Sequence, residues 1–175
     1  MGISVDLIKE LRARTGAGVN DCRLALKETD NNLEKAIEFL RKRGLEIVKK
    51  KQDLVAKQGR VEAYIHTGGK VGVLVEINCQ TDFVANTEEF ICFAKDIAMQ
   101  ITAMSPKYIR REDVPKDVID KEHDPERFYE KNCLLEQLFI KDQNIKIKDY
   151  LHSLIAKTGE NIVVRRFTRF QLGQE

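Results

Sequence analysis

The chain has no tryptophan, three prolines and four cysteines that lie far apart among its 175 residues. None of the cysteines forms a Cys-x-x-Cys pair or lies near a histidine at metal-ligand spacing, so neither a zinc site nor a disulfide scaffold is indicated. No apolar run reaches the roughly 18 residues of a membrane-spanning helix, and the N-terminus lacks the basic and apolar regions of a secretion signal. We therefore expect a soluble protein of a reducing compartment, with Cys22 and Cys79 as buried free thiols.

Recognisable catalytic groups are also scarce. The three histidines, His66, His123 and His152, have no serine or cysteine partner at a recognisable spacing, and the acids are scattered over helical surfaces. The segment 68–72 contains glycines and a lysine, but it departs from the Gly-x-x-x-x-Gly-Lys-Ser/Thr pattern of phosphate loops. We expect a protein that is not an enzyme, has no cofactor or metal, and does not itself bind a nucleotide.

The net charge is only +2, but it is unevenly distributed. Residues 1–60 hold 14 Lys and Arg against 9 Asp and Glu, and six of the basic residues gather at positions 41–43 and 49–51. Such a cluster could contact RNA phosphates or an acidic protein surface, but it more often marks a helix end and a solvated connector. Because no aromatic platform or nucleic-acid motif accompanies the lysines, we favour the connector and do not expect RNA binding.

Three amphipathic stretches precede the basic cluster. Their apolar residues recur at helical spacing, and glycines or polar turn residues separate them. The third stretch carries Lys and Arg in its last turn and Gly44 after it, as helix ends prefer. Each helix is too short to be stable alone, so we predict a small three-helix module with a basic connector over residues 1–54.

Residues 55–175 have a different pattern. Two alternating runs, 61–66 and 71–79, flank the Gly-Gly turn of 67–70, which is typical of a β-hairpin. Apolar residues recur at helical spacing from Phe90 onward, which predicts a helix. The stretch 105–125 contains all three prolines and is typical of a connector. Asp124-Pro125 then predicts the start of another helical segment that reaches Leu138. A further helix over 147–156 and a strand over 162–172 complete an α+β core with a small antiparallel sheet flanked by helices.

The connection after the second alternating run contains Asp82 and Phe83 side by side. Connections between rigid elements often carry binding residues, so a contact function is one interpretation. In the other, Phe83 packs in the core, Asp82, Asn86 or Thr87 caps the next helix, and Asn86 with Glu89 forms a capping box. Spacing alone favours the core for Phe83, since phenylalanine is usually found inside proteins.

Three blocks of sequence resemble the signatures of translation elongation factor Ts. They are Thr15–Arg23 with Ala25-Leu26 after it, Asn78–Asn86, and Gly159–Phe167. They occur in the family's order, and the resemblance covers most of the chain. It implies a guanine-nucleotide exchange factor for elongation factor Tu, acting in a bacterial cytoplasm or an organelle stroma or matrix. It also implies a ubiquitin-associated-like three-helix module followed by an α+β core.

The resemblance assigns the candidate site residues. It implies that the loop Thr81-Asp82-Phe83-Val84 pushes on the GTPase domain of Tu, with Phe83 entering between helices and Asp82 disturbing the magnesium and phosphate site. It further implies that the three-helix module binds the same domain through Arg12, Val19 and Asn20. On this basis we expect Phe83 to be a contact residue.

The sequence departs from the family pattern at several positions. Gln80 replaces a usual acid, Leu138 a proline and Thr168 a cysteine, and a helical insertion is shortened within 121–133. The chain resembles the short form with one core repeat, whose members can pair through their final strands, so a non-covalent homodimer through residues 162–172 is one expectation. Two other classes remain open: a ubiquitin-like-binding adaptor and a ribosome- or RNA-associated protein.

Overall fold

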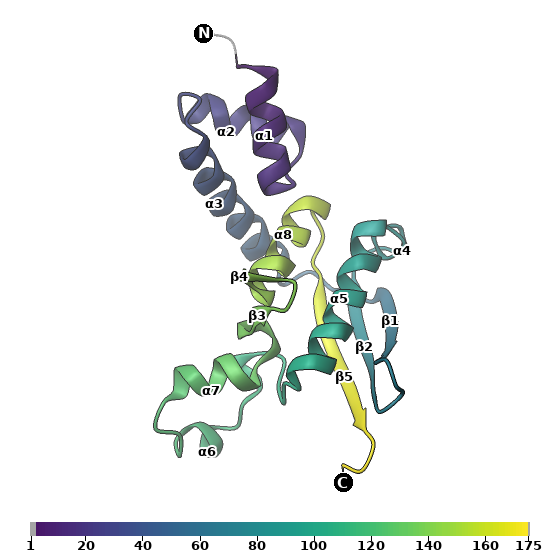
Figure 1. The fold of residues 1–175 in the computed structure, drawn as a ribbon. Helices are drawn as coiled ribbons and strands as arrows, with labels where there is room; N and C mark the ends of the chain where they lie inside the picture. The colour runs from purple at the N-terminus through teal and green to yellow at the C-terminus, as the bar shows by residue number, and fades with distance from the viewer. Residues whose placement is uncertain (1–2, 175) are drawn as a thin grey trace. The chain divides into compact units, whose positions relative to one another are not determined.

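The computed structural model describes residues 3–174, which form two compact units (Figure 1). The first unit comprises the described residues up to Asp53 together with His152–Asn161. The second unit comprises Leu54–Leu151 together with the described residues from Ile162 onward. Each unit has its own apolar core, so each is described separately.

Three helices build the first unit: α1 (Val5–Thr15), α2 (Val19–Glu28) and α3 (Leu33–Lys51). The Ser4 side chain accepts a hydrogen bond from the Asp6 amide at the start of α1, and Asn32 accepts one from the Lys35 amide at the start of α3. The fully buried residues come from all three helices: Leu11, Cys22, Ala25, Leu26 and Ala36. The predicted three-helix module is therefore present, and its Cys22 is a buried free thiol as expected.

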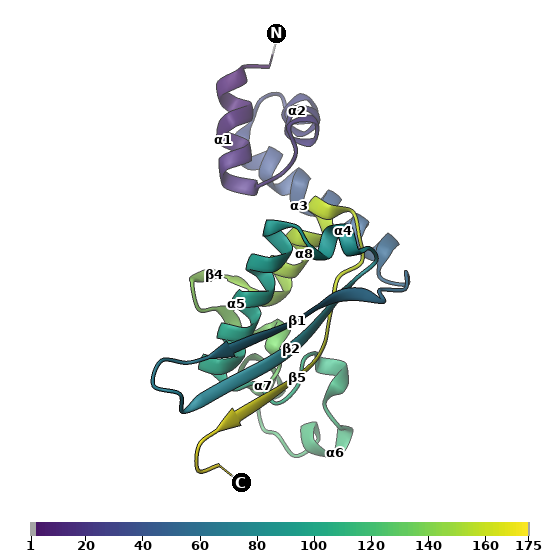
Figure 2. The ribbon, with the colours of Figure 1, turned by 90° about the vertical axis from the view of Figure 1, so that its right-hand side faces the viewer.

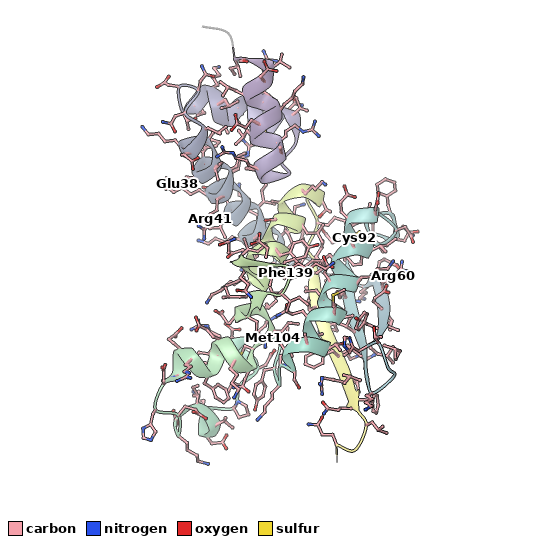
Figure 3. The ribbon with its side chains drawn as sticks, viewed as in Figure 1. Glu38, Arg41, Arg60, Cys92, Met104 and Phe139 are labelled. Atoms are coloured by element: carbon pink, nitrogen blue, oxygen red, sulfur yellow. The ribbon has the colours of Figure 1, made fainter. Side chains whose placement is uncertain are left out.

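The predicted end of the third helix at Gly44 is wrong, because α3 continues to Lys51. A Cβ added to Gly44 would lie 3.4 Å from the Cβ of Ala156, so the glycine lets another segment of the same unit approach the helix closely. The cost of about 1 kcal/mol for a glycine inside a helix is not enough to end α3 at this position. The basic residues 41–43 and 49–51 consequently lie on a helix and not on a connector; Figure 3 shows Glu38 and Arg41 on α3.

The second unit contains a three-stranded antiparallel sheet with the strand order β1-β2-β5. Its strands are β1 (Gln58–Ile65), β2 (Val71–Cys79) and β5 (Val163–Gln171). The helix α5 (Glu88–Met104) lies against one face of this sheet (Figure 2). The core between them contains alternate residues of β2 and one side of α5: Val73, Val75, Ile77, Cys79, Phe90, Phe93, Ala94, Ile97 and Ile101. The predicted hairpin, late strand and α+β class are confirmed.

The segment between α5 and β5 differs in part from expectation. The helix that starts after Asp124 ends at Asn132 and does not reach Leu138. The backbone amides of Lys107 and Tyr108 donate to the Asn132 carbonyl, so an earlier segment binds the helix end. The remaining elements are η1 (Arg111–Asp113), α6 (Lys116–Ile119), α7 (Pro125–Asn132), η2 (Leu134–Glu136), β3 (Leu138–Phe139), β4 (Asp142–Lys146) and α8 (Ile147–Thr158).

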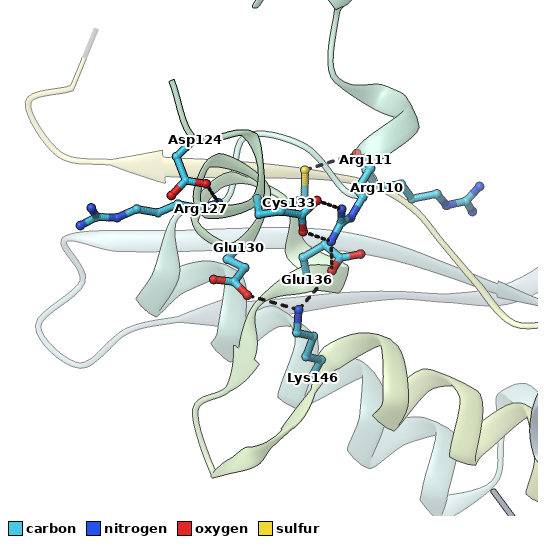
Figure 4. Close-up of polar contacts among 9 residues, drawn as sticks. Arg110, Arg111, Asp124, Arg127, Glu130, Cys133, Glu136 and Lys146 are labelled. Atoms are coloured by element: carbon cyan, nitrogen blue, oxygen red, sulfur yellow. Dashed lines mark hydrogen bonds and ion pairs between the residues drawn. The ribbon is translucent and has the colours of Figure 1, made fainter. Parts of the chain in front are cut away.

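An ionic network joins several of these short elements (Figure 4). Arg111 donates to both carboxylate oxygens of Glu126, at 2.6 and 2.8 Å, and to Glu136 at 2.9 Å. Lys146 donates to Glu136 at 3.3 Å and to Glu130 at 3.4 Å. Hydrogen bonds from Arg111 and Lys146 hold the pKa of the Glu136 carboxyl at about 2, against the opposing effect of its burial. Neither η1 nor α7 contributes a buried residue, and this network connects both of them to η2 and β4.

Candidate partner-binding site

The candidate loop folds as a single helical turn, α4 (Asp82–Ala85), between β2 and α5. The Thr81 hydroxyl oxygen accepts a hydrogen bond from the Val84 amide at 3.3 Å and caps the turn. The Thr87 hydroxyl oxygen accepts a hydrogen bond from the Phe90 amide and caps α5. Of the three predicted caps, Asp82, Asn86 and Thr87, the structure therefore has Thr87. The expected capping box of Asn86 with Glu89 is wrong, since Asn86 directs its amide to the Asp82 carbonyl.

The side chains of α4 point in opposite directions relative to the core. Phe83 is 80% exposed, whereas Val84 is 6% and Ala85 5% exposed. The alternative in which Phe83 packs in the core is therefore wrong. Thr81 and Asp82 are exposed beside Phe83, so the turn presents an aromatic ring next to a hydroxyl and a carboxylate. Val84 is the one candidate of this loop whose side chain is buried, and it anchors the turn to the second unit.

Three side chains donate hydrogen bonds to backbone carbonyls of the turn. Cys79 donates from its thiol to the Thr81 carbonyl at 3.0 Å, Asn86 to Asp82 at 2.8 Å and Thr87 to Val84 at 2.8 Å. From the sequence, we did not predict that Cys79 or Asn86 would form hydrogen bonds to the backbone of the turn. Both residues lie in the block Asn78–Asn86 that contains the turn, but sequence spacing does not specify which backbone carbonyl a side chain reaches.

The second set of candidates lies in the first unit. Arg12 lies in the last turn of α1, whose C-terminus is closed by Gly16 with a φ of 67°. Val19 and Asn20 are the first two residues of α2. All three are exposed, Val19 by 49%, and none of them belongs to the buried cluster of the module. The structure therefore leaves Arg12, Val19 and Asn20 available on the surface of the first unit.

Within residues 3–174, no group of three or more His, Cys, Asp or Glu is arranged to hold a metal ion. Within the same range, no helix is both long and apolar enough to span a membrane.

Comparison with known proteins gives consistent matches. A family model described as Elongation factor TS matches residues 8–126. The Elongation factor Ts of Carboxydothermus hydrogenoformans is 52% identical, with 98% of this chain and 90% of the relative covered. That of a Thermoanaerobacter species is 51% identical, with coverage of 98% and 96%. That of Thermotoga neapolitana is 47% identical, with both chains covered completely.

This chain is shorter than its alignment with one of these relatives. The match to the Thermotoga neapolitana protein spans 196 positions, whereas this chain has 175 residues, so about 21 aligned positions have no residue here. A shortened segment was expected from the sequence, although the alignment length does not locate it. With the match to the family model over most of the chain and about 50% identity to several relatives, the chain belongs to the elongation factor Ts family.

Proposed function

We propose that this chain is a guanine-nucleotide exchange factor for elongation factor Tu. It binds the GTPase domain of Tu and accelerates the release of GDP during translation elongation. The observation that best supports this proposal is Phe83, which is 80% exposed on a turn that its neighbours anchor in the core. Full burial of a phenylalanine side chain contributes about 1.5–3 kcal/mol, so an exposed ring on a fixed turn is suited to enter a partner.

Phe83 and Asp82 have different tasks in this proposal. The Phe83 ring enters between helices of the GTPase domain and favours the conformation that makes room for it. Asp82, adjacent and exposed, places a negative charge near the magnesium and phosphate site and disturbs its coordination. Thr81 and Val84 hold these two residues in place, one as the cap of the turn and the other as its buried anchor.

Exchange of this kind is a coupling between two binding events and requires no bond chemistry. If the chain binds more tightly to the Tu conformation with disturbed magnesium contacts, GDP binds that conformation more weakly. Linkage then requires GDP to weaken the binding of the chain by the same factor. A coupling of about 1.4 kcal/mol corresponds to a tenfold change in affinity, so one aromatic side chain that fits only the nucleotide-poor state has a large effect.

The first unit supplies the holding contact. Arg12, Val19 and Asn20 are exposed and combine a positive charge, an apolar side chain and an amide, which suits a mixed protein surface. Contacts here stay the same whether GDP is bound or absent, so they raise the affinity for Tu without changing the conformation that Phe83 selects. We place the action in the bacterial cytoplasm, because the relatives named above are bacterial.

The test is the release of a fluorescent GDP analogue from elongation factor Tu of Carboxydothermus hydrogenoformans, followed by stopped flow with excess unlabelled GDP. Release that accelerates with the concentration of the chain supports exchange. Phe83→Ala should lower the release rate at saturating concentration by about tenfold or more while the fold is kept. An unchanged rate for Phe83→Ala would contradict the proposed role of the ring.

The same preparation separates the two rival classes. An adaptor of ubiquitin-like proteins would retain ubiquitin and ignore Tu in a binding assay. A ribosome- or RNA-associated protein would bind RNA through residues 41–51 with an affinity that falls steeply as salt increases. Neither class uses the exposed Phe83 on α4, and both become relevant if the chain fails to bind Tu.

We also propose a non-covalent homodimer through the C-terminal strand. Among the described residues, β5 pairs with β2 along one side, and no other strand is paired along its second side. The exposed apolar residues Phe170 and Leu172, 68% and 78% exposed, lie at the end of this strand. An unpaired strand edge with apolar side chains favours pairing with a second copy.

A further inference from the structure

The turn α4 poses a physical problem, since a helix of four residues is a single turn. Isolated helices this short are unstable in water, because forming the first turn fixes several residues for one hydrogen bond. Yet α4 carries Phe83 with 80% of its surface exposed, so no packing of that ring holds the turn in shape. The stability of the turn must come from other groups.

Asn86 closes the turn from its C-terminal side. Its side-chain amide donates to the Asp82 carbonyl at 2.8 Å, and its backbone amide donates to the same carbonyl at 3.1 Å. The two bonds bridge Asp82 and Asn86, and the residues between them include Phe83. Asn86 is itself exposed, so its side chain could bond to water instead, yet it binds the backbone of the turn.

Cys79 and Thr87 act on the two neighbouring sides. Cys79 is fully buried at the end of β2, and its thiol donates to the Thr81 carbonyl at 3.0 Å. Thr87 donates to the Val84 carbonyl at 2.8 Å. Together with buried Val84 and Ala85, these bonds connect the turn to β2 before it and to α5 after it. Asp82 and Phe83 are left on the exposed side.

We propose that Asn86 is a positioning residue for exchange, which together with Cys79 holds α4 as a preformed wedge before a partner binds. This inference rests on the proposed exchange function. A preformed turn lets Phe83 enter the partner without a further ordering cost. If the turn opens for part of the time, only the closed fraction is competent, and the effect on the partner falls by that fraction.

The experiment compares Asn86→Ala, Asn86→Asp and Asn86→Gln in the full chain. GDP release from elongation factor Tu of Carboxydothermus hydrogenoformans is measured over a range of chain concentrations, which gives a limiting rate and a half-saturating concentration. Loss of one hydrogen bond should lower the ratio of closed to open turn about fivefold in Asn86→Ala, and the limiting rate should fall measurably, by up to this factor. Asn86→Asp, whose carboxylate cannot donate, should be at least as slow, and Asn86→Gln, which keeps the donor, should regain most of the rate.

The half-saturating concentration provides a second readout. It should change by less than about twofold in all three variants, because the first unit supplies the holding contact and is untouched. In the free chain, the backbone amides of Ala85 and Asn86 should exchange with solvent faster in Asn86→Ala than in the wild type, measured by NMR. This links the change in rate to opening of the turn.

Asn132 offers a matched control in the same unit. Its side-chain amide donates to the Phe128 carbonyl at 3.0 Å. As with Asn86 and Asp82, the donor and the acceptor are four residues apart, but this bond lies on α7. Asn132→Ala should leave the limiting rate unchanged. Equal slowing by Asn132→Ala, or a limiting rate for Asn86→Ala equal to the wild type while Phe83→Ala is slow, would overturn the positioning role alone. A wild-type chain that does not accelerate GDP release at any concentration would instead contradict the proposed function.

Discussion

Phe83 and Val84 are adjacent in the chain and have opposite surroundings. Phe83 is 80% and Val84 6% exposed, because the single turn of α4 directs one side chain to solvent and the next into the second unit. Phenylalanine is the larger and the more costly to expose, so its position is unfavourable for the isolated chain. Binding residues concentrate on the connections between rigid elements, and an exposed aromatic ring on such a connection fits the proposed role of Phe83.

The pair gives a prediction about stability. Val84→Ala removes buried methyl groups and should lower the free energy of unfolding by about 2 kcal/mol. Phe83→Ala removes an exposed ring and should change the same quantity by less than about 0.5 kcal/mol. Chemical denaturation of both variants measures this difference, and equal losses would mean that the Phe83 ring packs against the fold in solution.

At Gly59, the neighbouring strand decides which residue the backbone position can accept. Its φ is 142°, and a Cβ at this position would collide with the Ile77 carbonyl oxygen on the neighbouring strand. Gly59 lies opposite Asn78, close to where β2 leads into α4. A side chain at this position would force β1 away from β2 and disturb the strand end that supports the turn.

We predict that Gly59→Ala lowers the free energy of unfolding by about 3 kcal/mol, through the strained φ and the collision together. Gly68→Ala is the control, since Gly68 has a φ of 91° but nothing within 4 Å of an added Cβ. It should cost about 1 kcal/mol. Thermal or denaturant unfolding of the two variants compares the costs; a Gly68→Ala loss as large as that of Gly59→Ala would assign the effect to φ alone.

At the scale of elements, an ionic network connects segments that have no buried apolar residue. The short elements η1 and α7 have no buried residue, yet they are connected to β4 and η2 through Arg111, Glu136 and Lys146. Glu136 is 7% exposed, and the Arg111 guanidinium also lies 4.7 Å from the centre of the Tyr129 ring. Removal of one partner of such a buried group leaves the others uncompensated.

The network predicts a pH dependence with a defined sign. The folded-state pKa of Glu136, about 2, lies below its ordinary value of 4.5. Its stabilising contribution is therefore complete above pH 4.5 and is lost as the pH falls from 4.5 toward 2. Glu136→Gln should lower the free energy of unfolding at pH 7 by about 2 kcal/mol and weaken its dependence on pH in this window.

Glu130→Gln is the matched control for this prediction. Glu130 also pairs with Lys146, at 3.4 Å, but its side chain is 57% exposed. Exposed ion pairs contribute little, so the variant should lose less than about 0.5 kcal/mol. Denaturation curves measured from pH 7 down to pH 3 test both variants. An acid dependence in Glu136→Gln as steep as in the wild type would assign it to other carboxylates.

At the scale of the whole molecule, the proposed homodimer gives a prediction about mass. Phe170→Glu and Leu172→Glu place negative charges at the end of β5 and should convert a dimer into the 20.1 kDa monomer. Val61→Glu is the control, since Val61 is 65% exposed on β1 at the opposite edge of the same sheet. Sedimentation equilibrium measures the mass, and a wild-type chain that is monomeric at every concentration would contradict the dimer.

The sequence by itself determined the elements whose signals are local. Helical spacing predicted α1 and α2, alternation with a Gly-Gly turn predicted the β1-β2 hairpin, and Asp124-Pro125 predicted the start of α7. Three local blocks of sequence also led to the family, which the comparisons confirm. These predictions succeeded because periodicity, caps and turn residues act over a few positions of the chain.

Only the tertiary structure decided which residues face solvent and where some helices end. Spacing favoured a buried Phe83, but burial of Val84 and Ala85 fixes the turn so that the ring points outward. Gly44 predicted a helix end, but packing beside Ala156 lets α3 continue, and α7 ends at Asn132 because the amides of residues 107 and 108 bind its last carbonyl. Each outcome depends on contacts between residues far apart in the chain, and periodicity carries no information about such contacts.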